Sequence, residues 1–348
     1  MYNHDFHHVK EFRLRRLAAW ICLAFSLLII IGVVVYSFQS GIIHGLGRSS
    51  IQPPAIPGFT QNNNTPCSTA RSTGDSTIEI SSSGTKRSFI LHLPPTYGQQ
   101  PLPMVVNYHG YDNTAANFEH YTNMGAEADQ AHFVVVFPQG ALDNNVPQPK
   151  PSWNAGIGAG GPTGLTDDVQ FTRDMLSYLQ RNYCIDTHRV YVTGYSIGAS
   201  MAYRVACALS NQIAALATVE GAFYHIPPNG CEATRSVPVL DIHSLADQFA
   251  PYNGDTARKL IAVSTFLNLW FAIDQCNTSA SQTIFHKADV TGYKWSNCAN
   301  GMVVEHYKIT DGGHVWAGSS IAMPSLGYTT HTIDANTLLW NFFSGFKR

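Results

Sequence analysis

The chain has 348 residues, of which 45% are hydrophobic and 13% are charged, and its formal net charge is −2. This length and apolar content are enough to bury the core of one large α/β domain or of two smaller ones, which excludes a disordered chain. The nearly balanced charge excludes a strongly basic surface, so no nucleic-acid partner is expected.

The N-terminus carries a basic segment followed by a long uncharged one. Four basic side chains lie between residues 10 and 16, and residues 17–37 contain no charge. The uncharged run is long enough to cross a bilayer, and the preceding basic residues place the N-terminus in the cytoplasm. It is longer than a signal-peptide core usually is, which favours an anchor, although Val35-Tyr36-Ser37 would permit cleavage. We therefore expect an extracellular or membrane-anchored protein whose folded part lies outside the cytoplasm.

A change in composition separates this segment from the folded part of the chain. Residues 38–73 are rich in Pro, Asn, Ser, Thr and Gly, which is typical of a linker. The expected organisation is a basic tail (1–16), a membrane anchor or signal segment (17–37), the linker and a folded domain (74–348).

Strand-like and helix-like patterns alternate through the folded domain. Strands are expected at residues 77–81, 87–93, 104–108, 133–137, 190–193, 214–219, 237–243 and 303–309. Helices are expected at residues 115–130, 167–183, 197–209, 257–274 and 334–343, and Thr166 with the two following acids would begin the second of them. This alternation predicts an α/β fold with a mainly parallel sheet covered by helices on both faces.

One strand-to-helix junction carries a nucleophile motif. Gly194-Tyr195-Ser196-Ile197-Gly198 fits the pattern G-x-S-x-G and lies between an apolar strand and a helix. The glycines let the chain reverse within a few residues, which holds Ser196 in a strained conformation with its hydroxyl exposed. The amide groups of the following helix would favour a developing oxyanion nearby. Ser196 is therefore the expected nucleophile.

A serine nucleophile needs a histidine that takes its proton and a carboxylate that orients the histidine. His314 follows the last expected strand in a loop with two glycines, and it is the expected base. Asp247 follows the strand at residues 237–243 and is the expected acid; Asp241 is the alternative and Asp274 a third candidate.

Other groups are expected to surround this triad. The backbone N–H groups of Ile197 and Tyr111 are the expected oxyanion donors. Aromatic rings of Trp153, Trp316 and Tyr195 are candidates for contact with the substrate, with core packing as the alternative.

Asp167 and Asp168 could suggest a metal pair. They lie in the first turn of an expected helix, which favours capping and loop bracing instead. No metal and no cofactor is expected.

Six cysteines follow the apolar run, and an even number in an oxidising compartment predicts three disulfides. Two pairs would close short loops and the third follows by elimination: Cys207 with Cys231, Cys276 with Cys298, and Cys67 with Cys184. No two of them have the C-x-x-C spacing typical of zinc or redox sites.

The motifs that distinguish the chain are His109-Gly110, Ser152-Trp153-Asn154, Asp167-Asp168-Val169-Gln170-Phe171, Gly194-Tyr195-Ser196, Ala246-Asp247 and Gly312-Gly313-His314-Val315-Trp316. Together they resemble the polyhydroxybutyrate depolymerase and feruloyl esterase group of α/β-hydrolases, over about residues 75–345. The resemblance implies an α/β-hydrolase fold and a secreted carboxylic ester hydrolase with Ser196, Asp247 and His314 as its triad. It also supports the two short-loop disulfides, because cysteines occupy like places in such sequences.

Two positions depart from this family's pattern. Ser244 and Leu245 follow His243 where the family tends to have Gly-Thr, and Ile197 stands where Asn is usual. Only the backbone N–H is needed at residue 197, so the chemistry should be retained while contacts with substrate change.

The expected function is hydrolysis of hydroxyalkanoate polyester or oligoester bonds through an acyl-enzyme. A feruloyl or acetyl-xylan esterase acting on plant polysaccharide is the alternative within the same class, because these activities share one scaffold. A binding module on an inactive hydrolase scaffold is the alternative of another class, and a complete Ser, Asp and His set argues against it.

Overall fold

The computed structural model describes residues 67, 69–157, 159, 166–226 and 230–348. The expected basic tail, the apolar run at residues 17–37 and most of the linker lie outside the described residues. Among the helices in the described ranges, none has the length and hydropathy that a bilayer span requires.

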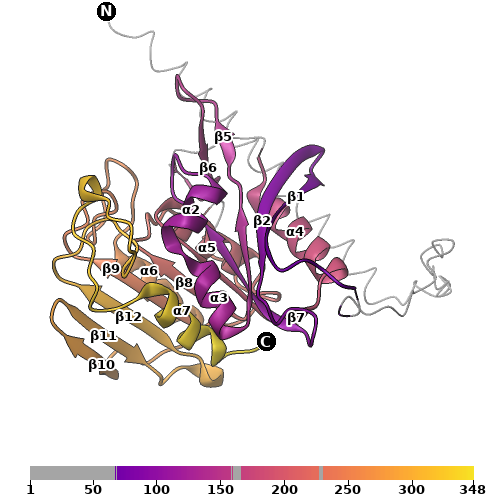
Figure 1. The fold of residues 1–348 in the computed structure, drawn as a ribbon. Helices are drawn as coiled ribbons and strands as arrows, with labels where there is room; N and C mark the ends of the chain where they lie inside the picture. The colour runs from indigo at the N-terminus through magenta and orange to yellow at the C-terminus, as the bar shows by residue number, and fades with distance from the viewer. Residues whose placement is uncertain (1–66, 68, 158, 160–165, 227–229) are drawn as a thin grey trace, which may run out of the picture. The chain divides into compact units, whose positions relative to one another are not determined.

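A ten-stranded sheet forms the centre of the described residues (Figure 1). From one edge to the other its strands are β1 (Gly74–Ser82), β2 (Thr85–Leu93), β4 (Val134–Pro138), β3 (Leu102–Tyr108), β7 (Ile185–Gly194), β8 (Ala215–Val219), β9 (Val239–Ser244), β12 (Val304–Ile309), β11 (Val290–Trp295) and β10 (Ser281–Lys287). The strands from β4 to β12 run parallel, and antiparallel hairpins complete both edges. The expected parallel centre is confirmed.

Helices cover both faces of the sheet. One face packs against α4 (Asp168–Asn182), α5 (Ile197–Ala208) and α6 (Val263–Ile273). The other packs against α2 (Ala115–Thr122), α3 (Met124–Ala131) and α7 (Ala335–Ser344), which lie in front of the sheet in Figure 1. Successive side chains of a strand point to opposite faces, so Met104 and Val106 pack on the first face while Val105 packs on the second. Every central strand is thereby buried on both sides.

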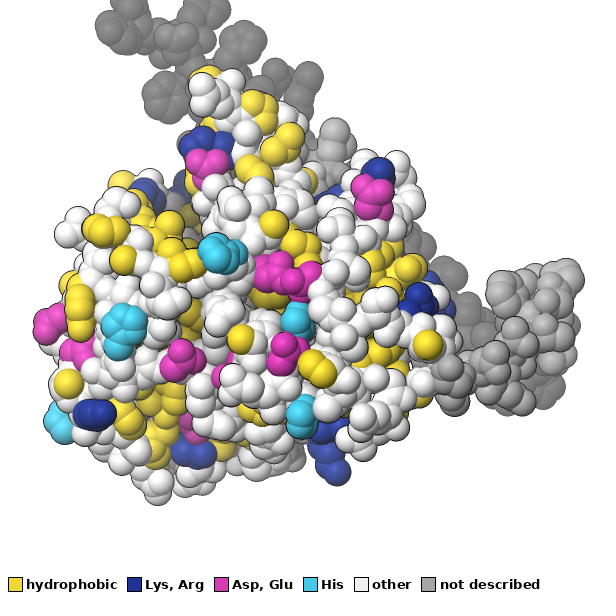
Figure 2. Space-filling view, in the orientation of Figure 1, with side chains coloured by type: hydrophobic (Ala, Val, Ile, Leu, Met, Phe, Trp, Pro, Cys, Tyr) yellow, Lys and Arg dark blue, Asp and Glu magenta, His cyan; other side chains and the backbone are white. Residues whose placement is uncertain are grey.

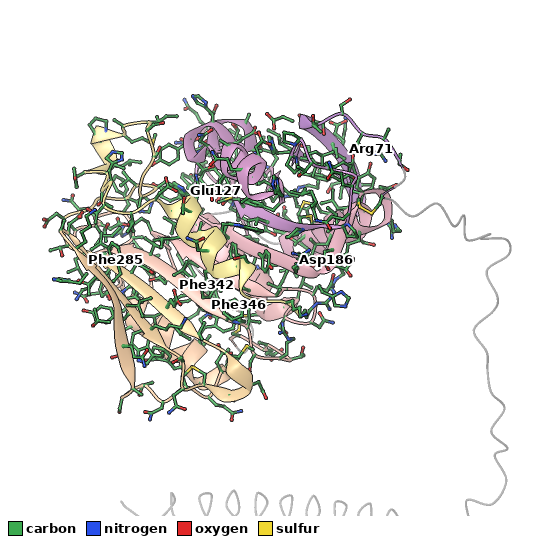
Figure 3. The ribbon with its side chains drawn as sticks, turned by 60° about the horizontal axis from the view of Figure 1, so that its bottom comes forward. Arg71, Glu127, Asp186, Phe285, Phe342 and Phe346 are labelled. Carbon is green, nitrogen blue, oxygen red and sulfur yellow. A yellow bond between two sulfur atoms is a disulfide. The ribbon has the colours of Figure 1, made fainter. Side chains whose placement is uncertain are left out.

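The last helix closes the second face through aromatic contacts. Phe343 stacks on Tyr191 of β7 with ring centroids 4.8 Å apart. Phe342 contacts Phe346, just beyond the helix, at 5.0 Å (Figure 3). On the face shown in Figure 2, acidic and basic side chains are scattered among hydrophobic side chains and other uncharged atoms.

Two expected helices have different bounds in the structure. The single helix expected over residues 115–130 is α2 and α3, because Asn123 between them has the left-handed φ of 51°. The helix expected from residue 257 begins only at Val263. Asp255 and Leu260 instead close a turn through reciprocal backbone hydrogen bonds of 3.0 and 2.8 Å, and Lys259 within it has a φ of 61° that no helix accommodates.

Two hairpins were not expected from the sequence pattern. In the outer one, β10 is almost wholly exposed, so it lacks the apolar alternation that marks a half-buried strand. The other joins β5 (Ala141–Asp143) to β6 (Lys150–Ser152), whose strands are too short for a pattern to show.

The start of α4 corrects one expectation and bears out another. Asp167, rather than Thr166, caps the helix by accepting the Gln170 N–H at 2.9 Å. Asp168 is buried and pairs with Arg87 at 2.8 Å. The two acids therefore cap the helix and brace the fold.

Three disulfides link the described cysteines, in the pairs expected from the sequence: Cys67–Cys184, Cys207–Cys231 and Cys276–Cys298. The first of them joins the segment before β1 to the residue that precedes β7.

A cluster of titratable side chains holds β1 and β2 against α2 and α3. The two nitrogens of His92 lie 2.6 Å from Asp75 Oδ1 and 2.9 Å from Asp129 Oδ1. Burial lowers the pKa of His92, but its bonds to Asp129 and Asp75 outweigh this and raise it. Burial and the neighbouring Asp75 carboxyl raise the pKa of Glu119 to about 7.

Glu119→Gln is expected to stabilise the protein above neutral pH. Because the folded-state pKa of Glu119 exceeds its unfolded value, the carboxyl favours the folded state only at low pH, and this contribution is lost as the pH rises to about 7. The difference in melting temperature, variant minus parent, should therefore increase by about 2–4 °C between about pH 4.5 and 7. Above about pH 7 the difference should stay constant. Glu79→Gln, in an exposed pair with Lys86, is the matched control and should show no such increase. A pH-independent difference for Glu119→Gln would contradict the assignment.

Candidate active site

Ser196 lies on a sharp turn between β7 and α5. Its backbone has φ 58° and ψ −126°, a conformation that costs a non-glycine residue free energy. The turn packs so closely on β3 that a Cβ atom on Gly198 would lie 2.1 Å from the Tyr108 carbonyl oxygen. Glycine at this position is therefore a requirement of packing, and the nucleophile motif has the geometry expected from the sequence.

The structure brings Ser196, His314 and Asp247 together. His314 Nε2 lies 2.9 Å from Ser196 Oγ, and His314 Nδ1 lies 2.6 Å from Asp247 Oδ2. Asp247 follows β9 and His314 follows β12, so all three come from the carboxyl ends of parallel strands, where loops meet. This order of contacts lets the imidazole take a proton from the hydroxyl while the carboxylate holds the ring.

The surroundings of Asp247 keep it ionised. Its Oδ1 atom accepts the backbone N–H groups of Phe249 and Ala250 at 2.7 and 2.8 Å. Burial raises the pKa of Asp247, but the hydrogen bond and charge of His314 outweigh this and lower it below its usual value. An ionised Asp247 accepts a proton-bearing Nδ1, which leaves Nε2 of His314 free to accept the hydroxyl of Ser196.

The alternative acids have other partners. Asp241 lies inside β9, accepts the Thr218 hydroxyl at 2.7 Å and lies 2.9 Å from Nδ1 of His306. Asp274 accepts the Val237 N–H at 3.1 Å. Neither carboxyl is a partner of His314 in the described part of the chain, so Asp247 is the acid that the geometry favours.

Both expected oxyanion donors lie beside the nucleophile. Ile197 is the first residue of α5, so its N–H has no acceptor within the helix. The loop after β3 touches the same turn, since a Cβ atom on Gly110 would lie 3.4 Å from Cβ of Ser196. Tyr111, the next residue, lines the cleft above Ser196.

A buried histidine fixes the orientation of the Gly110–Tyr111 peptide. His109 Nε2 accepts the Gly140 N–H at 2.9 Å, so the proton is on Nδ1, which donates to the Gly110 carbonyl oxygen at 2.7 Å. Burial lowers the pKa of His109 to about 4, so the ring is neutral near pH 7. In a trans peptide the C=O and N–H groups point in opposite directions. The N–H of Tyr111 therefore points away from the buried ring.

A cleft of about 770 Å³ opens over Ser196 and His314. Tyr195 lines it, as expected, and its hydroxyl donates to the His314 carbonyl oxygen. Trp153 and Trp316, the other two expected aromatic contacts, lie in the core with 0% and 1% of their surface exposed. Their indole N–H groups donate to the His109 carbonyl oxygen and to Asn336 Oδ1, so they support the site from behind. Their expected contact with substrate is thereby corrected.

Phe249, which no sequence motif indicated, lines the cleft and is 48% exposed. Its ring stacks on the His314 imidazole with centroids 5.5 Å apart, and Tyr195 lies against the same imidazole at 4.9 Å. The only signal in the sequence was its position two residues after the acid.

The cleft has apolar and polar parts. Its apolar side chains beyond Phe249 include Ile321, Met323 and Leu326, which come from the loop after His314. The cleft also has polar groups, which come from α2 and the loop before it: Asn113, Asn117 and His120. The site can therefore receive a ligand with an apolar part and a hydrogen-bonding part.

A parallel sheet with a serine on a strand-to-helix turn, and with an acid and a histidine on later strand ends, defines the α/β-hydrolase fold. Residues 87–250 match the family model described as Esterase PHB depolymerase. The resemblance expected from the sequence motifs is thus confirmed: the chain is similar to the polyhydroxybutyrate depolymerase and feruloyl esterase group.

Individual proteins that are similar to this chain are also named as esterases. The chain is 27% identical over 240 residues to feruloyl esterase B of Piromyces equi, covering 66% of this chain and 42% of that protein. It is 26% identical over 215 residues to the bifunctional acetylxylan esterase/xylanase XynS20E of Neocallimastix patriciarum, covering 61% and 28%. The chain thus spans less than half the length of both relatives. An acetyl xylan esterase structure from Aspergillus awamori shares the fold, with a TM-score of 0.51, 16% identity and coverage of 69% and 94%.

Proposed function

We propose that the chain is a serine carboxylic ester hydrolase with Ser196 as nucleophile, His314 as base and Asp247 as the acid that orients it. The observation that carries the proposal is the position of His314, with one ring nitrogen 2.9 Å from Ser196 Oγ and the other 2.6 Å from Asp247. The relatives named as esterases support the same class of reaction.

The reaction begins when His314 takes the proton of the Ser196 hydroxyl and the oxygen attacks the ester carbonyl. The tetrahedral oxyanion accepts hydrogen bonds from the N–H groups of Ile197 and Tyr111. The C–O bond to the alcohol then breaks, His314 gives the alcohol its proton, and the acyl group remains on Ser196. Water, deprotonated by His314, attacks this acyl-enzyme and releases the acid.

The proposed substrate is an acyl ester of a saccharide, with an acetyl or hydroxycinnamoyl group as the acyl part. The combination of an apolar wall and polar side chains from α2 fits an acyl group joined to a hydroxyl-rich alcohol. A hydroxyalkanoate oligoester, the substrate expected first from the sequence, stays the second candidate because the family model bears a polyhydroxybutyrate depolymerase description.

The proposed location is outside the cytoplasm. Three disulfides are present among the described cysteines, and disulfides persist mainly in oxidising compartments. The apolar run at residues 17–37 would serve for export or anchoring.

The test is hydrolysis of p-nitrophenyl acetate, methyl ferulate, acetylated xylan and 3-hydroxybutyrate oligomers by the protein and by Ser196→Ala. We expect the parent to cleave the first three and the variant to cleave none. If the parent cleaves the 3-hydroxybutyrate oligomers faster than the other three compounds, a hydroxyalkanoate oligoester is the substrate and the saccharide ester is not. A folded parent that is as inert as Ser196→Ala on all four would overturn the esterase proposal and favour a binding role.

A further inference from the structure

A second carboxyl group lies buried behind the acid of the triad. Glu220 directly follows β8 and has no exposed surface. Its backbone has a φ of 45°, in the left-handed region that costs a non-glycine residue free energy. The residue before Glu220 and the second residue after it bond to the backbone of Ser196: Ser196 N–H donates to the Val219 carbonyl oxygen and Ala222 N–H donates to the Ser196 carbonyl oxygen, both at 3.1 Å. Glu220 is thus fixed beside the catalytic turn.

The Glu220 side chain bonds to the residue from which the loop of Asp247 starts; this loop is called the acid loop below. Its Oε2 atom accepts the backbone N–H of Ser244 at 3.0 Å, and its Oε1 atom lies 2.9 Å from the Ser244 hydroxyl. Ser244 ends β9, three residues before Asp247. It also packs on the loop of the base, since a Cβ atom on Gly312 would lie 2.3 Å from Ser244 Oγ. One carboxyl therefore anchors the point where the loops of Asp247 and His314 meet.

The charges around Glu220 do not neutralise an ionised carboxylate. Tyr121, Tyr195, His243 and Asp247 face it in addition to Ser244. His243 Nε2 lies 3.8 Å from Glu220 Oε2, but it donates to the Ala250 carbonyl oxygen at 2.8 Å. Burial lowers the pKa of His243, so its ring is neutral near pH 7. Glu220 has no other ion-pair partner in the part of the chain that the structure describes.

Two buried carboxyls in contact cannot both be ionised at low cost. A carboxyl oxygen of Glu220 and one of Asp247 lie within 4.8 Å of each other. Asp247 has the imidazole of His314 and two backbone N–H groups to stabilise its charge. Burial, followed by the charge of Asp247, raises the pKa of Glu220 well above its usual value. The single proton of the pair is therefore on Glu220.

We propose that Glu220 is a positioning residue of the esterase site: as a neutral carboxylic acid it keeps its proton and donates a hydrogen bond to Asp247, and through Ser244 it holds the loop of Asp247 against His314. Asp247 accepts three donors, which are Phe249 N–H, Ala250 N–H and His314, and the proposed bond from Glu220 adds a fourth. Four donors match the about four lone-pair sites of a carboxylate. The inference rests on the proposed esterase function.

The test compares Glu220→Gln with Glu220→Leu in kcat, KM and the pH profile of kcat/KM on p-nitrophenyl acetate. Gln is neutral, has the size of Glu and can both donate and accept, so we expect kcat within about threefold of the parent and an unchanged acidic limb. Leu removes the bonds to Ser244 and Asp247. We expect kcat to fall about 10–100-fold with little change in KM, as when a group that orients a functional side chain is lost. The acidic limb should move to higher pH, because Asp247 without this donor stabilises the imidazolium more strongly.

Two results would overturn the proposal. If Glu220 is ionised in the parent, Gln removes a negative charge near His314, and the acidic limb moves to lower pH instead. If folded Glu220→Leu keeps the kcat and pH profile of the parent, Glu220 positions nothing. If Glu220→Leu does not fold, Ser244→Ala is used instead, because this variant removes the contact between the Ser244 hydroxyl and Glu220. An unchanged kcat in Ser244→Ala would then overturn the proposal.

A measurement independent of activity separates this inference from the esterase function. At neutral pH, the infrared difference spectrum of the parent minus Glu220→Gln should contain a C=O stretch of a protonated buried carboxylic acid. Other protonated carboxyls, such as Glu119 with its pKa of about 7, are present in both proteins and cancel in the difference. Absence of that band from an active parent refutes the protonated Glu220 and leaves the esterase function intact. An inert parent that shows the band refutes the esterase function instead, and with it the catalytic role of Glu220.

Discussion

Asp247→Asn is expected to lower kcat on p-nitrophenyl acetate by about four orders of magnitude and to leave KM nearly unchanged. The carboxylate accepts the Nδ1 proton of His314 over 2.6 Å. An amide turned with its NH2 group toward the ring would favour the other tautomer, in which Nε2 carries the proton and cannot accept the Ser196 hydroxyl. Because the change acts on proton transfer, substrate binding should be retained. Steady-state kinetics at neutral pH measures both quantities.

Asp241→Asn is the matched control, since Asp241 is the alternative acid and lies in the strand that precedes the acid loop. It is fully buried and contacts Thr218 and His306. Its replacement should lower the melting temperature, because a buried polar contact is lost, and should keep kcat within a few fold. Equal losses of kcat in the two variants would contradict the assignment of Asp247.

The triad could be expected from the sequence because its requirements are local. A serine between glycines at the junction of an apolar strand and a helix can adopt few conformations, and the close approach of Gly198 to β3 shows why that residue has no side chain. Asp247 and His314 each follow a strand of the parallel sheet, and the carboxyl ends of such strands share one edge. The order Ser, Asp, His along the chain is the order of an α/β-hydrolase triad, so the sequence predicts the nucleophile, the acid and the base.

Other parts of the site depend on contacts that no local pattern contains. Trp153 and Trp316 are candidates for substrate contact in the sequence, with core packing as the alternative, and in the structure each is buried with a partner for its indole N–H. Glu220 could not be distinguished from a surface acid, since its partner Ser244 lies 24 residues away on the next strand. Burial of a polar side chain is set by the tertiary fold, and the sequence of one strand does not specify it.

His109→Phe is expected to lower kcat by about 100-fold while the melting temperature and KM change less. Phenylalanine fills the space of the imidazole but cannot donate to the Gly110 carbonyl oxygen or accept the Gly140 N–H. The Gly110–Tyr111 peptide would then lose the bond that fixes its plane, and the N–H of Tyr111 would no longer be held for the oxyanion. The measured quantities are kcat, KM and the affinity for a boronic acid, which mimics the tetrahedral intermediate.

The affinity for the boronic acid distinguishes an oxyanion effect from general loosening of the cleft. A transition-state mimic should lose affinity in parallel with kcat/KM, whereas a product acid should bind as it does to the parent. The acidic limb of the pH profile should not move, because burial lowers the pKa of His109 to about 4 and the ring is neutral wherever His314 can act as a base. His188→Phe makes the same chemical change at an exposed side chain and should leave all these quantities unaltered. If His109→Phe instead raises KM and weakens the mimic and the product alike, the ring shapes the cleft and does not orient the oxyanion donor.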